Sequence, residues 1–352
     1  MANNTGLENP NLRALIRDQH GVLSATQAVS RGLSRETMRR RVLHGLWQRP
    51  VPGVYALQSG PPSRLQWLIA AQLYAGEGSV LTGRAALSVH GLEVDGPACL
   101  EDPMADQFAM DQLHALVPHR MRRQNIARLR ITRTTRVPKP MRFGVLRVAP
   151  LARSIVDSCL RAVEEGEEAT IDGIVTAALA DGRVRLTELE DELGRAPRRH
   201  SGRLRMELAK SKAHERAAAA RRLLDQIRAS GPHGAQHEVT IYLGQARVAQ
   251  ATAIWPNRAV AAVVDAPERE IRALNALGFA VVHATPRQVQ EDPASVLRHV
   301  GDVLAERPEA TLPAGLCLLP LAVGPQRVLT ASSPARTGVS SVLPAGGTGQ
   351  TK

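Results

Sequence analysis

The sequence predicts an α+β multidomain protein, and three observations support this fold class. The chain has 352 residues, which at roughly 150 residues per domain suggests two or three domains. Short helical patterns followed by β-prone segments fill its start, while strands alternate with helices after residue 236. Hydrophobic residues make up 43% and charged residues 22%, a composition typical of a chain with a buried core, which excludes a wholly disordered protein.

Three short helices are predicted in the first 45 residues. The first has apolar residues at i, i+3 and i+4 from Leu12 and stops near Gly21. Ser24 and Ser34 are suited to cap the second and third helices. The third helix spans residues 34–44, and its expected buried side carries Met38, Val42 and Leu46.

A hairpin is predicted directly after the third helix. Short β-prone pieces, from Trp47 to Tyr55, flank a Pro-Gly turn. Three helices and a hairpin within about 50 residues form a winged helix-turn-helix, whose third helix lies in the major groove of DNA. We expect Trp47 and Tyr55 to anchor the small core. We expect Arg41 either to cover apolar surface with its side chain or to cap the third helix. The expected DNA contacts are Arg35, Thr37, Arg39, Arg40 and, in the wing, Arg49.

The positive charge is concentrated in the first part of the chain. The net charge is +12, but 41 of the 45 basic residues are arginine, which indicates a codon bias. Residues 1–150 contain 20 Lys and Arg and 10 Asp and Glu, a net of +10, whereas residues 151–352 contain 25 and 23, a net of +2. This asymmetry favours a local acidic partner, such as DNA, for the first part.

Residues 119–142 are basic and contain no Asp or Glu. Alternation around residues 127–134 predicts a strand with one strongly basic face. We interpret this stretch as a second phosphate-contacting surface; a solvated basic loop and a face for an acidic partner are the alternatives. The expected contacts are Arg120, Arg122, Arg123, Arg128, Arg130 and Arg133.

The remaining pattern predicts five segments. Further helices are expected over residues 63–75, 80–91, 149–163, 170–180, 186–193, 203–228, 267–277 and 293–305, and strands over 112–118, 238–243, 246–255, 259–265 and 279–284. The predicted segments are a winged helix at 11–57, a mixed α/β region at 63–163, a helical connector at 164–230, an α/β domain at 236–306 and a disordered tail at 308–352.

Several other classes of protein find no support in the sequence. No apolar run approaches 18 residues, and the N-terminal residues lack the apolar core of a secretory signal, so we expect a cytoplasmic protein without membrane contact. Three distant cysteines predict neither a disulfide framework nor a zinc cluster. His90 lacks a second ligand and is expected to be structural, and no nucleotide-binding or hydrolase motif occurs. We therefore expect no cofactor, metal site or catalytic residue.

The N-terminal half resembles the AbiEi family of type IV toxin–antitoxin antitoxins. The resemblance rests on LRALIRDQHGVLSATQAVSRGLSRETMRRRVLHGLWQRPVPGVYAL, and on the stretches VLTGRAALSVHGL, LVPHRMRRQNIARLRITRTTRVP and RVAPLARSIVDSCLRAV that follow in order. It implies a DNA-binding transcriptional regulator that represses its own operon. A toxin partner and a homodimer are further implications.

The C-terminal part resembles a Vsr-like, restriction-endonuclease-like domain that has lost its chemistry. In that family an Asp on one strand and an acidic pair on the next hold Mg²⁺. Thr252 and Val263 stand at two of these positions here, and Asp265 remains. Two alternatives stay open: a metal-dependent nuclease that uses Asp265 with Glu215 or Glu238, and a protein-binding antitoxin without DNA function.

Overall fold

The computed structural model describes residues 9–92 and 113–320. The chain divides into two compact units, residues 1–214 (unit 1) and residues 215–352 (unit 2). The predicted connector, residues 164–230, is therefore shared between them. Cys99 and the part of the predicted tail beyond residue 320 lie outside the described residues.

Unit 1 begins with the three predicted helices, each with a polar N-cap. The side chain of Asn9 accepts a hydrogen bond from the first turn of its helix, Ser24 forms a capping box with Gln27, and Ser34 accepts from the backbone of Thr37. Such caps satisfy backbone N–H groups that have no partner within a helix. The helices are α1 (Pro10–Asp18), α2 (Ala25–Val29) and α3 (Arg35–Leu43).

A three-stranded antiparallel sheet joins these helices. Its strands are β1 (Val22–Ser24), β2 (Gln48–Val51) and β3 (Val54–Ala56), in the order β1-β3-β2. The hairpin was predicted, with its tight turn at Gly53 (φ +73°), but β1 was not. Leu46 was wrongly expected inside and is 54% exposed, because α3 ends at Leu43 and the helical period no longer applies beyond it. The small core contains Leu12, Leu23, Ala28, Leu33, Met38 and Trp47.

A second sheet, of five strands, follows in unit 1. Its order is β6-β5-β4-β8-β7. The strands are β4 (Val80–Thr82), β5 (Leu113–Pro118), β6 (Leu129–Thr134), β7 (Met141–Phe143) and β8 (Leu146–Val148). The prediction of one helix over residues 80–91 was wrong at its start: residues 80–82 form the buried strand β4, and Gly83 (φ +69°) turns the chain into α5 (Gly83–Val89).

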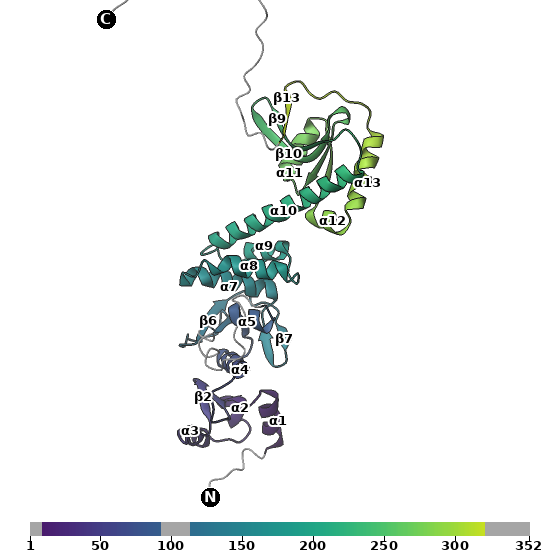
Figure 1. The fold of residues 1–352 in the computed structure, drawn as a ribbon. Helices are drawn as coiled ribbons and strands as arrows, with labels where there is room; N and C mark the ends of the chain where they lie inside the picture. Colours follow the sequence, from purple (N-terminus) through teal and green to yellow (C-terminus); the bar gives the residue numbers. More distant parts are fainter. Residues whose placement is uncertain (1–8, 93–112, 321–352) are drawn as a thin grey trace, which may run out of the picture. The chain divides into compact units, whose positions relative to one another are not determined.

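Helices cover this sheet and link it to the N-terminal elements (Figure 1). Helix α4 (Arg64–Ala75) packs its buried Leu68 and Ile69 in one core with Val22 and Val54 of the small sheet. Gln66 of α4 also donates a hydrogen bond to the carbonyl oxygen of His20, 2.9 Å away. The N-terminal elements are therefore packed on α4 rather than attached by a free linker.

Three helices pack beside α5 and enclose a separate core (Figure 1). These are α7 (Leu151–Glu165), α8 (Thr170–Ala180) and α9 (Leu186–Gly194), as predicted to within a few residues. The long helix α10 (Gly202–Ser230) starts in unit 1, where Leu204 and Leu208 join this core. Its second half belongs to unit 2, where Leu223 and Ile227 pack in another core.

A buried ionic network joins the large sheet of unit 1 to its helices. Thr82 donates to Asp157 over 2.7 Å, and Nε of Arg153 lies 2.9 Å from both oxygens of Asp157. A second nitrogen of Arg153 lies 3.4 Å from Glu192, which also accepts hydrogen bonds from Arg136 over 2.5 and 3.1 Å. Asp157, Arg153 and Glu192 are at most 9% exposed. Buried charges of this kind need their partners to stay ionised away from water.

Unit 2 contains a five-stranded sheet in the order β12-β11-β10-β9-β13, in which only β11 and β12 run parallel. The strands are β9 (Gln236–Leu243), β10 (Ala246–Trp255), β11 (Val260–Val264), β12 (Ala280–Ala284) and β13 (Leu316–Pro320). The prediction that the chain is disordered from residue 308 was wrong for Leu316–Pro320, because β13 pairs with β9 and covers its open edge.

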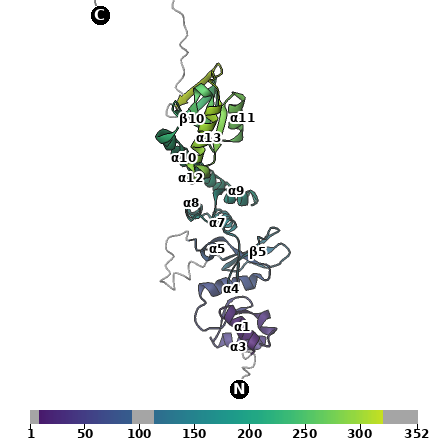
Figure 2. The same ribbon diagram turned by 90° about the vertical axis from the view of Figure 1, so that its right-hand side faces the viewer.

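Helices lie on both faces of the sheet of unit 2. Helices α10 and α11 (Glu268–Ala276) stand on opposite sides of it (Figure 2). Helices α12 (Pro286–Glu291), which was not predicted, and α13 (Pro293–Glu306) share the core of α10. Alternate residues of β11 enter the two cores, so all five of its residues are buried. The continuous apolar pattern of residues 260–264 follows from this.

Candidate nucleic-acid interface

The exposed face of α3 carries three arginines without an acidic partner. Arg35, Arg39 and Arg40 are all exposed, and no ion pair joins any of them to another described residue. Leu43, which the sequence analysis did not single out, lies one turn after Arg39 on this face and is 75% exposed. The α3 face thus presents guanidinium donors beside one apolar side chain.

The orientation of α3 is fixed from its opposite side. Met38 is fully buried in the small core. The hydroxyl of Ser34 accepts from the backbone N–H of Thr37 over 3.0 Å and lies 2.8 Å from the Thr37 hydroxyl. The Thr37 hydroxyl, predicted to contact DNA, is therefore already engaged in the cap, whereas the three arginines are not.

The hairpin after α3 holds one further exposed arginine. Arg49 lies in β2 and is exposed. Trp47 is buried, and its ring lies 6.3 Å from that of Tyr55, as expected for core anchors. Arg41 lies 5.2 Å from the centre of the Trp47 ring, a cation–π contact. Arg41 is thus turned toward the core, which separates it from Arg39 and Arg40.

Two aromatic residues of α4 position part of the basic stretch. Arg123 lies 5.8 Å from the centre of the Tyr74 ring, and Arg128 lies 5.1 Å from that of Trp67. The Tyr74 hydroxyl also donates to the carbonyl oxygen of Gln124 over 3.1 Å. Sequence reasoning missed these anchors, although seven residues separate Trp67 from Tyr74, which is two helical turns.

The predicted alternation on residues 127–134 is confirmed within β6, but its basic face is partly neutralised. In β6, Leu129 and Ile131 point into the core, while Arg130 lies on the other side and pairs with Glu164 over 3.0 Å. Arg133 lies two positions after Ile131 and therefore on the same side of the strand as the inward residues. It is nevertheless exposed, because it lies near the end of the strand. Arg136 is bound to Glu192, as described above. Acidic residues of α7 and α9 therefore neutralise part of the stretch.

Three predicted contacts of this stretch remain exposed and without an ion pair to another described residue. They are Arg120, Arg122 and Arg133. With Arg123 and Arg128, which are held on aromatic rings, they form what we call the second basic surface. It is smaller than the six predicted contacts, because Arg130 is paired with Glu164, but it keeps a positive charge in unit 1.

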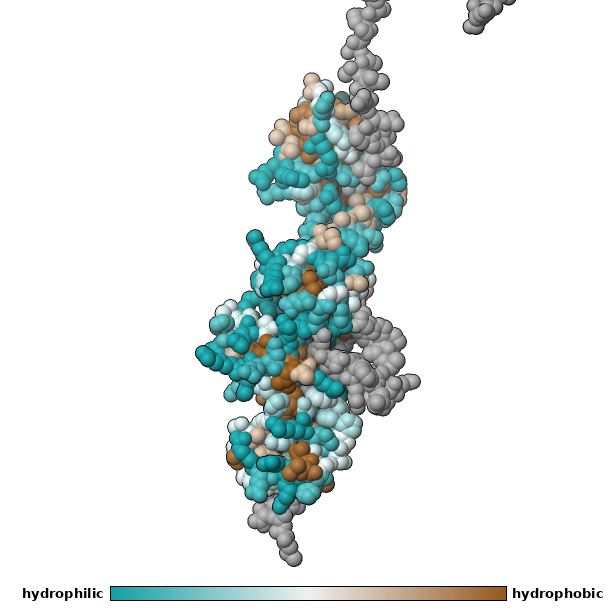
Figure 3. Space-filling model, turned by 90° about the vertical axis from the view of Figure 1, so that its left-hand side faces the viewer, coloured by the Kyte–Doolittle hydropathy of each residue, from teal (hydrophilic) through white to brown (hydrophobic). Residues whose placement is uncertain are grey.

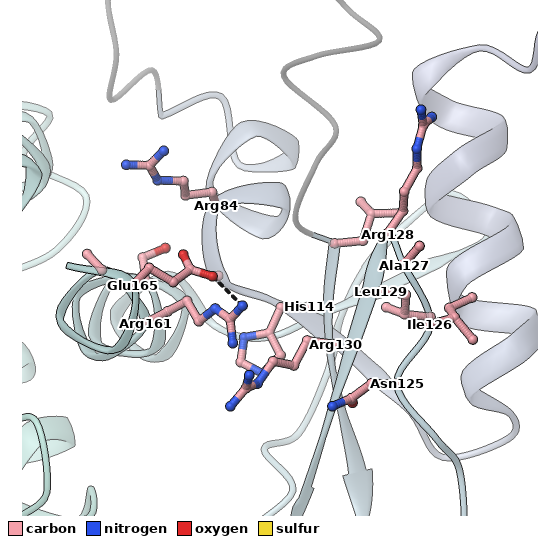
Figure 4. A pocket seen from close by; sticks show the side chains of 14 residues that line it. Arg84, His114, Asn125, Ile126, Ala127, Arg128, Leu129, Arg130, Arg161 and Glu165 are labelled. Carbon is pink, nitrogen blue, oxygen red and sulfur yellow. Dashed lines mark ion pairs between the residues drawn. The ribbon is translucent and has the colours of Figure 1, made fainter. Parts of the chain in front are cut away.

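A pocket of about 230 Å³ lies between α5, β5, β6 and α7. The His114 ring lies between the side chains of Arg130 and Arg161 (Figure 4). The side chains of Arg84 and Arg128 extend away from the His114 ring. Nε2 of His114 lies 2.9 Å from the Thr132 hydroxyl. Burial, more than any neighbouring charge, lowers the pKa of His114 to about 4. The ring is thus neutral at pH 7.

We expect the lowered pKa of His114 to make unit 1 less stable in mild acid. Below pH 6.5 the unfolded chain binds a proton on this ring, whereas the folded chain does not until about pH 4. Stability is therefore complete above pH 6.5 and lost as the pH falls toward 4, by at most about 3 kcal/mol. Urea unfolding at pH 7, 5.5 and 4.5 measures this loss, and His114→Gln should flatten it. His119→Gln, which changes an exposed histidine, is the control and should leave this loss unchanged. If the free energy of unfolding depends on pH equally in all three proteins, His114 is not the cause of the loss.

The other singled-out residues of unit 1 have structural roles. Nε2 of His90 lies 2.8 Å from the carbonyl oxygen of Ala149, and its ring contacts Phe143 edge-on at 5.1 Å. Burial raises the pKa of Cys159 to about 12, so this thiol stays protonated at pH 7 and is a poor nucleophile.

The residues of unit 2 do not fit the Mg²⁺ site that the nuclease resemblance implies. Val263 is fully buried on β11 and Thr252 is 8% exposed on β10. Asp265 follows β11. Among the described residues, no group of three His, Cys, Asp or Glu side chains is placed to hold a metal ion. A divalent cation needs several oxygen ligands, and Val263 and Thr252 do not supply the carboxylates that such a site would use.

Glu270 is a strongly buried carboxylate near these strands that the sequence did not indicate as buried. It lies in the first turn of α11, 5% exposed. Its oxygens lie 3.4 Å from Arg247 and 3.3 Å from the backbone nitrogen of Gln250. Glu270 therefore also fastens α11 to β10.

Comparison with known proteins supports a regulatory class for the N-terminal segment. Residues 11–58, which hold α3 and the hairpin, match the model of a family of transcriptional regulators. The family is described as "Transcriptional regulator, AbiEi antitoxin", so the predicted resemblance is confirmed for these residues. The match does not extend to the C-terminal part. A search of curated proteins gives no match. Within the described residues, no helix is long and apolar enough to cross a membrane.

Proposed function

We propose that this chain is a DNA-binding transcriptional regulator of the AbiEi antitoxin type. Residues 11–57 act as a winged helix-turn-helix that binds duplex DNA in the promoter of its own operon. The observation that carries the proposal is the α3 face, where Arg35, Arg39 and Arg40 are exposed and form no ion pair within the described part of the chain. It lies inside the segment that is similar to the regulator family.

The α3 face suits the major groove. Two guanidinium groups one position apart, Arg39 and Arg40, can each donate two hydrogen bonds to a guanine edge or contact a phosphate. The exposed Leu43 can contact a thymine methyl group. In the hairpin, Arg49 is suited to a phosphate. The polar caps and the buried Met38 hold α3 in one orientation before DNA arrives, which lowers the entropic cost of binding.

The second basic surface extends the phosphate footprint. A fluorescence-anisotropy titration of a duplex from the chain's own upstream region, at increasing salt, tests this. Each phosphate contact adds about 0.9 to the slope of log K against log salt concentration. We therefore expect Arg122→Ala with Arg133→Ala to reduce the slope by about 1.8.

The matched control removes two exposed arginines of unit 2, Arg272 and Arg298, whose side chains are 72% and 69% exposed. This pair should leave the slope unchanged. Equal slopes for the wild type and the Arg122/Arg133 variant would remove the second basic surface from the proposal and leave the α3 face.

We further propose that unit 2 is not a nuclease, and that it serves folding, dimerisation or a toxin partner. The apolar Val263 at an expected carboxylate position supports this. Incubation of the full chain with plasmid DNA and Mg²⁺ or Mn²⁺ tests it, with Asp265→Ala as the control. Cutting that needs both the metal and Asp265 would establish the nuclease alternative instead.

A further inference from the structure

The pocket beside β6 contains polar atoms that the described chain leaves without hydrogen bonds. Nδ1 of His114 and Oγ of Ser158 are shielded from solvent and have no hydrogen-bond partner among the described residues. A buried polar atom of this kind costs free energy unless a water, ion or ligand meets it. The described residues therefore leave hydrogen-bonding groups of this pocket unsatisfied.

The pocket lining has more basic than acidic side chains, although Arg84 also pairs with Glu167 outside the lining over 3.1 Å. It contains four arginines and one glutamate, so its formal charge is +3. The arginines are Arg84, Arg128, Arg130 and Arg161, and the glutamate is Glu165, which forms an ion pair with Arg161 (Figure 4). Positive charge in a concave, partly desolvated site favours an anion.

Two of these arginines already share one carboxylate oxygen. Oε2 of Glu164 lies 3.0 Å from a nitrogen of Arg130 and 3.5 Å from a nitrogen of Arg161. The guanidinium groups, one from a strand and one from a helix, are therefore close enough to hold the same oxyanion. The Glu164 side chain is 36% exposed, so it can turn into solvent when another anion takes its place.

The wall on the α5 side is kept open by a glycine. A Cβ atom at Gly83 would lie 3.4 Å from both Cβ and Nδ1 of His114, and Gly83 has a φ of +69° that disfavours other residues. A side chain at this position would therefore fill the space next to the imidazole.

We propose that this pocket is a binding site for a small phosphate-type anion, either inorganic phosphate or the phosphate group of a small phosphate monoester. Arg130 and Arg161 bind its oxygens, with Ser158 and His114 as further donors from the floor. Two guanidinium groups, a hydroxyl and an imidazole offer more donors than a planar carboxylate can use, and they suit a tetrahedral oxyanion. The volume of about 230 Å³ suits a small ligand and is below the usual range for drug-sized molecules.

The test is isothermal titration calorimetry of the full-length chain with inorganic phosphate, at constant ionic strength set by chloride and without DNA. We expect saturable binding at one site. Arg161→Met should weaken it at least tenfold, since a charge-assisted contact is lost. Glu164→Gln should strengthen it about threefold to fivefold, since a competing exposed carboxylate is lost.

The matched controls are Arg185→Met and Glu188→Gln, which alter an exposed Arg–Glu pair at the start of α9 with a separation of 2.9 Å and should leave phosphate binding unchanged. The two pocket variants are expected to change the affinity in opposite directions. Damage to the fold could explain weaker binding by Arg161→Met, but it could not explain stronger binding by Glu164→Gln. Heats that match those of chloride, or equal affinity in the wild type and both pocket variants, would overturn the site. An effect of the pocket variants on DNA binding alone would assign the arginines to DNA phosphates and likewise overturn it.

Discussion

Replacing Arg39 and Arg40 together with alanine is expected to weaken binding of the full chain to its upstream duplex by about 100-fold or more. Each arginine that bonds a base edge contributes about 1–3 kcal/mol of discrimination. Both side chains are exposed, so their removal leaves the core around Met38 unchanged. Anisotropy titrations with specific and scrambled duplexes at one salt concentration measure the effect.

Two further variants separate base recognition from charge. Arg39→Lys with Arg40→Lys keeps the charge but loses the two-pronged hydrogen bonding of the guanidinium group. We expect it to retain binding to the scrambled duplex and to lose preference for the specific one. Arg272→Ala with Arg298→Ala removes the same charge from unit 2 and should bind both duplexes as the wild type does. If the alanine variant of α3 binds like this control, the proposed function is wrong.

Asp157→Ala is expected to lower the free energy of unfolding of unit 1 by about 3–5 kcal/mol. The substitution leaves Arg153, which is 8% exposed, without its closest carboxylate, and it removes the acceptor of Thr82. Breaking a buried ion pair from one side is costly because the remaining charge stays buried without compensation. Urea unfolding followed by tryptophan fluorescence in a Trp255→Phe background reports on Trp47 and Trp67, both in unit 1.

The control for this prediction is Asp181→Ala, which removes a carboxylate that pairs with Arg183 over 2.6 Å near the surface. Surface ion pairs contribute about 0–1 kcal/mol. Combining Asp157→Leu with Arg153→Met should restore much of the stability, since apolar replacement of a buried pair is often neutral. If Asp157→Ala and Asp181→Ala are equally mild, the network does not hold the sheet to its helices.

Helices with strong local signals could be predicted from the sequence. Ser24 and Ser34 cap the helices that they were expected to cap, because an N-cap bonds only to residues two or three positions away. The strands β4 and β13 could not be predicted in this way. The sequence of Val80–Thr82 is compatible with the start of a helix, and it is a strand because it pairs with β5. Leu316–Pro320 is a strand because it pairs with β9, which lies more than 70 positions earlier in the chain.

The charge distribution shows the same division between local and tertiary information. Counting residues gave +10 for residues 1–150 and +2 for the rest, and it located the basic segments correctly. The count could not show that Glu164 neutralises Arg130 or that Glu192 neutralises Arg136, because each glutamate lies beyond residue 150. The arginines of α3 are exposed as predicted, and no acidic side chain within residues 9–92 and 113–320 forms an ion pair with them.

The sequence by itself determined the caps and periods of the N-terminal helices, the hairpin and the basic segments. Each of these depends on residue type and on spacing over a few positions. Only the tertiary structure decided which arginines remain free, that Trp67 and Tyr74 position the second basic surface, and that His114, Ser158, Arg130 and Arg161 share one pocket. Ion pairing, stacking and desolvation depend on distances through space, and the fold sets these between residues far apart in the chain.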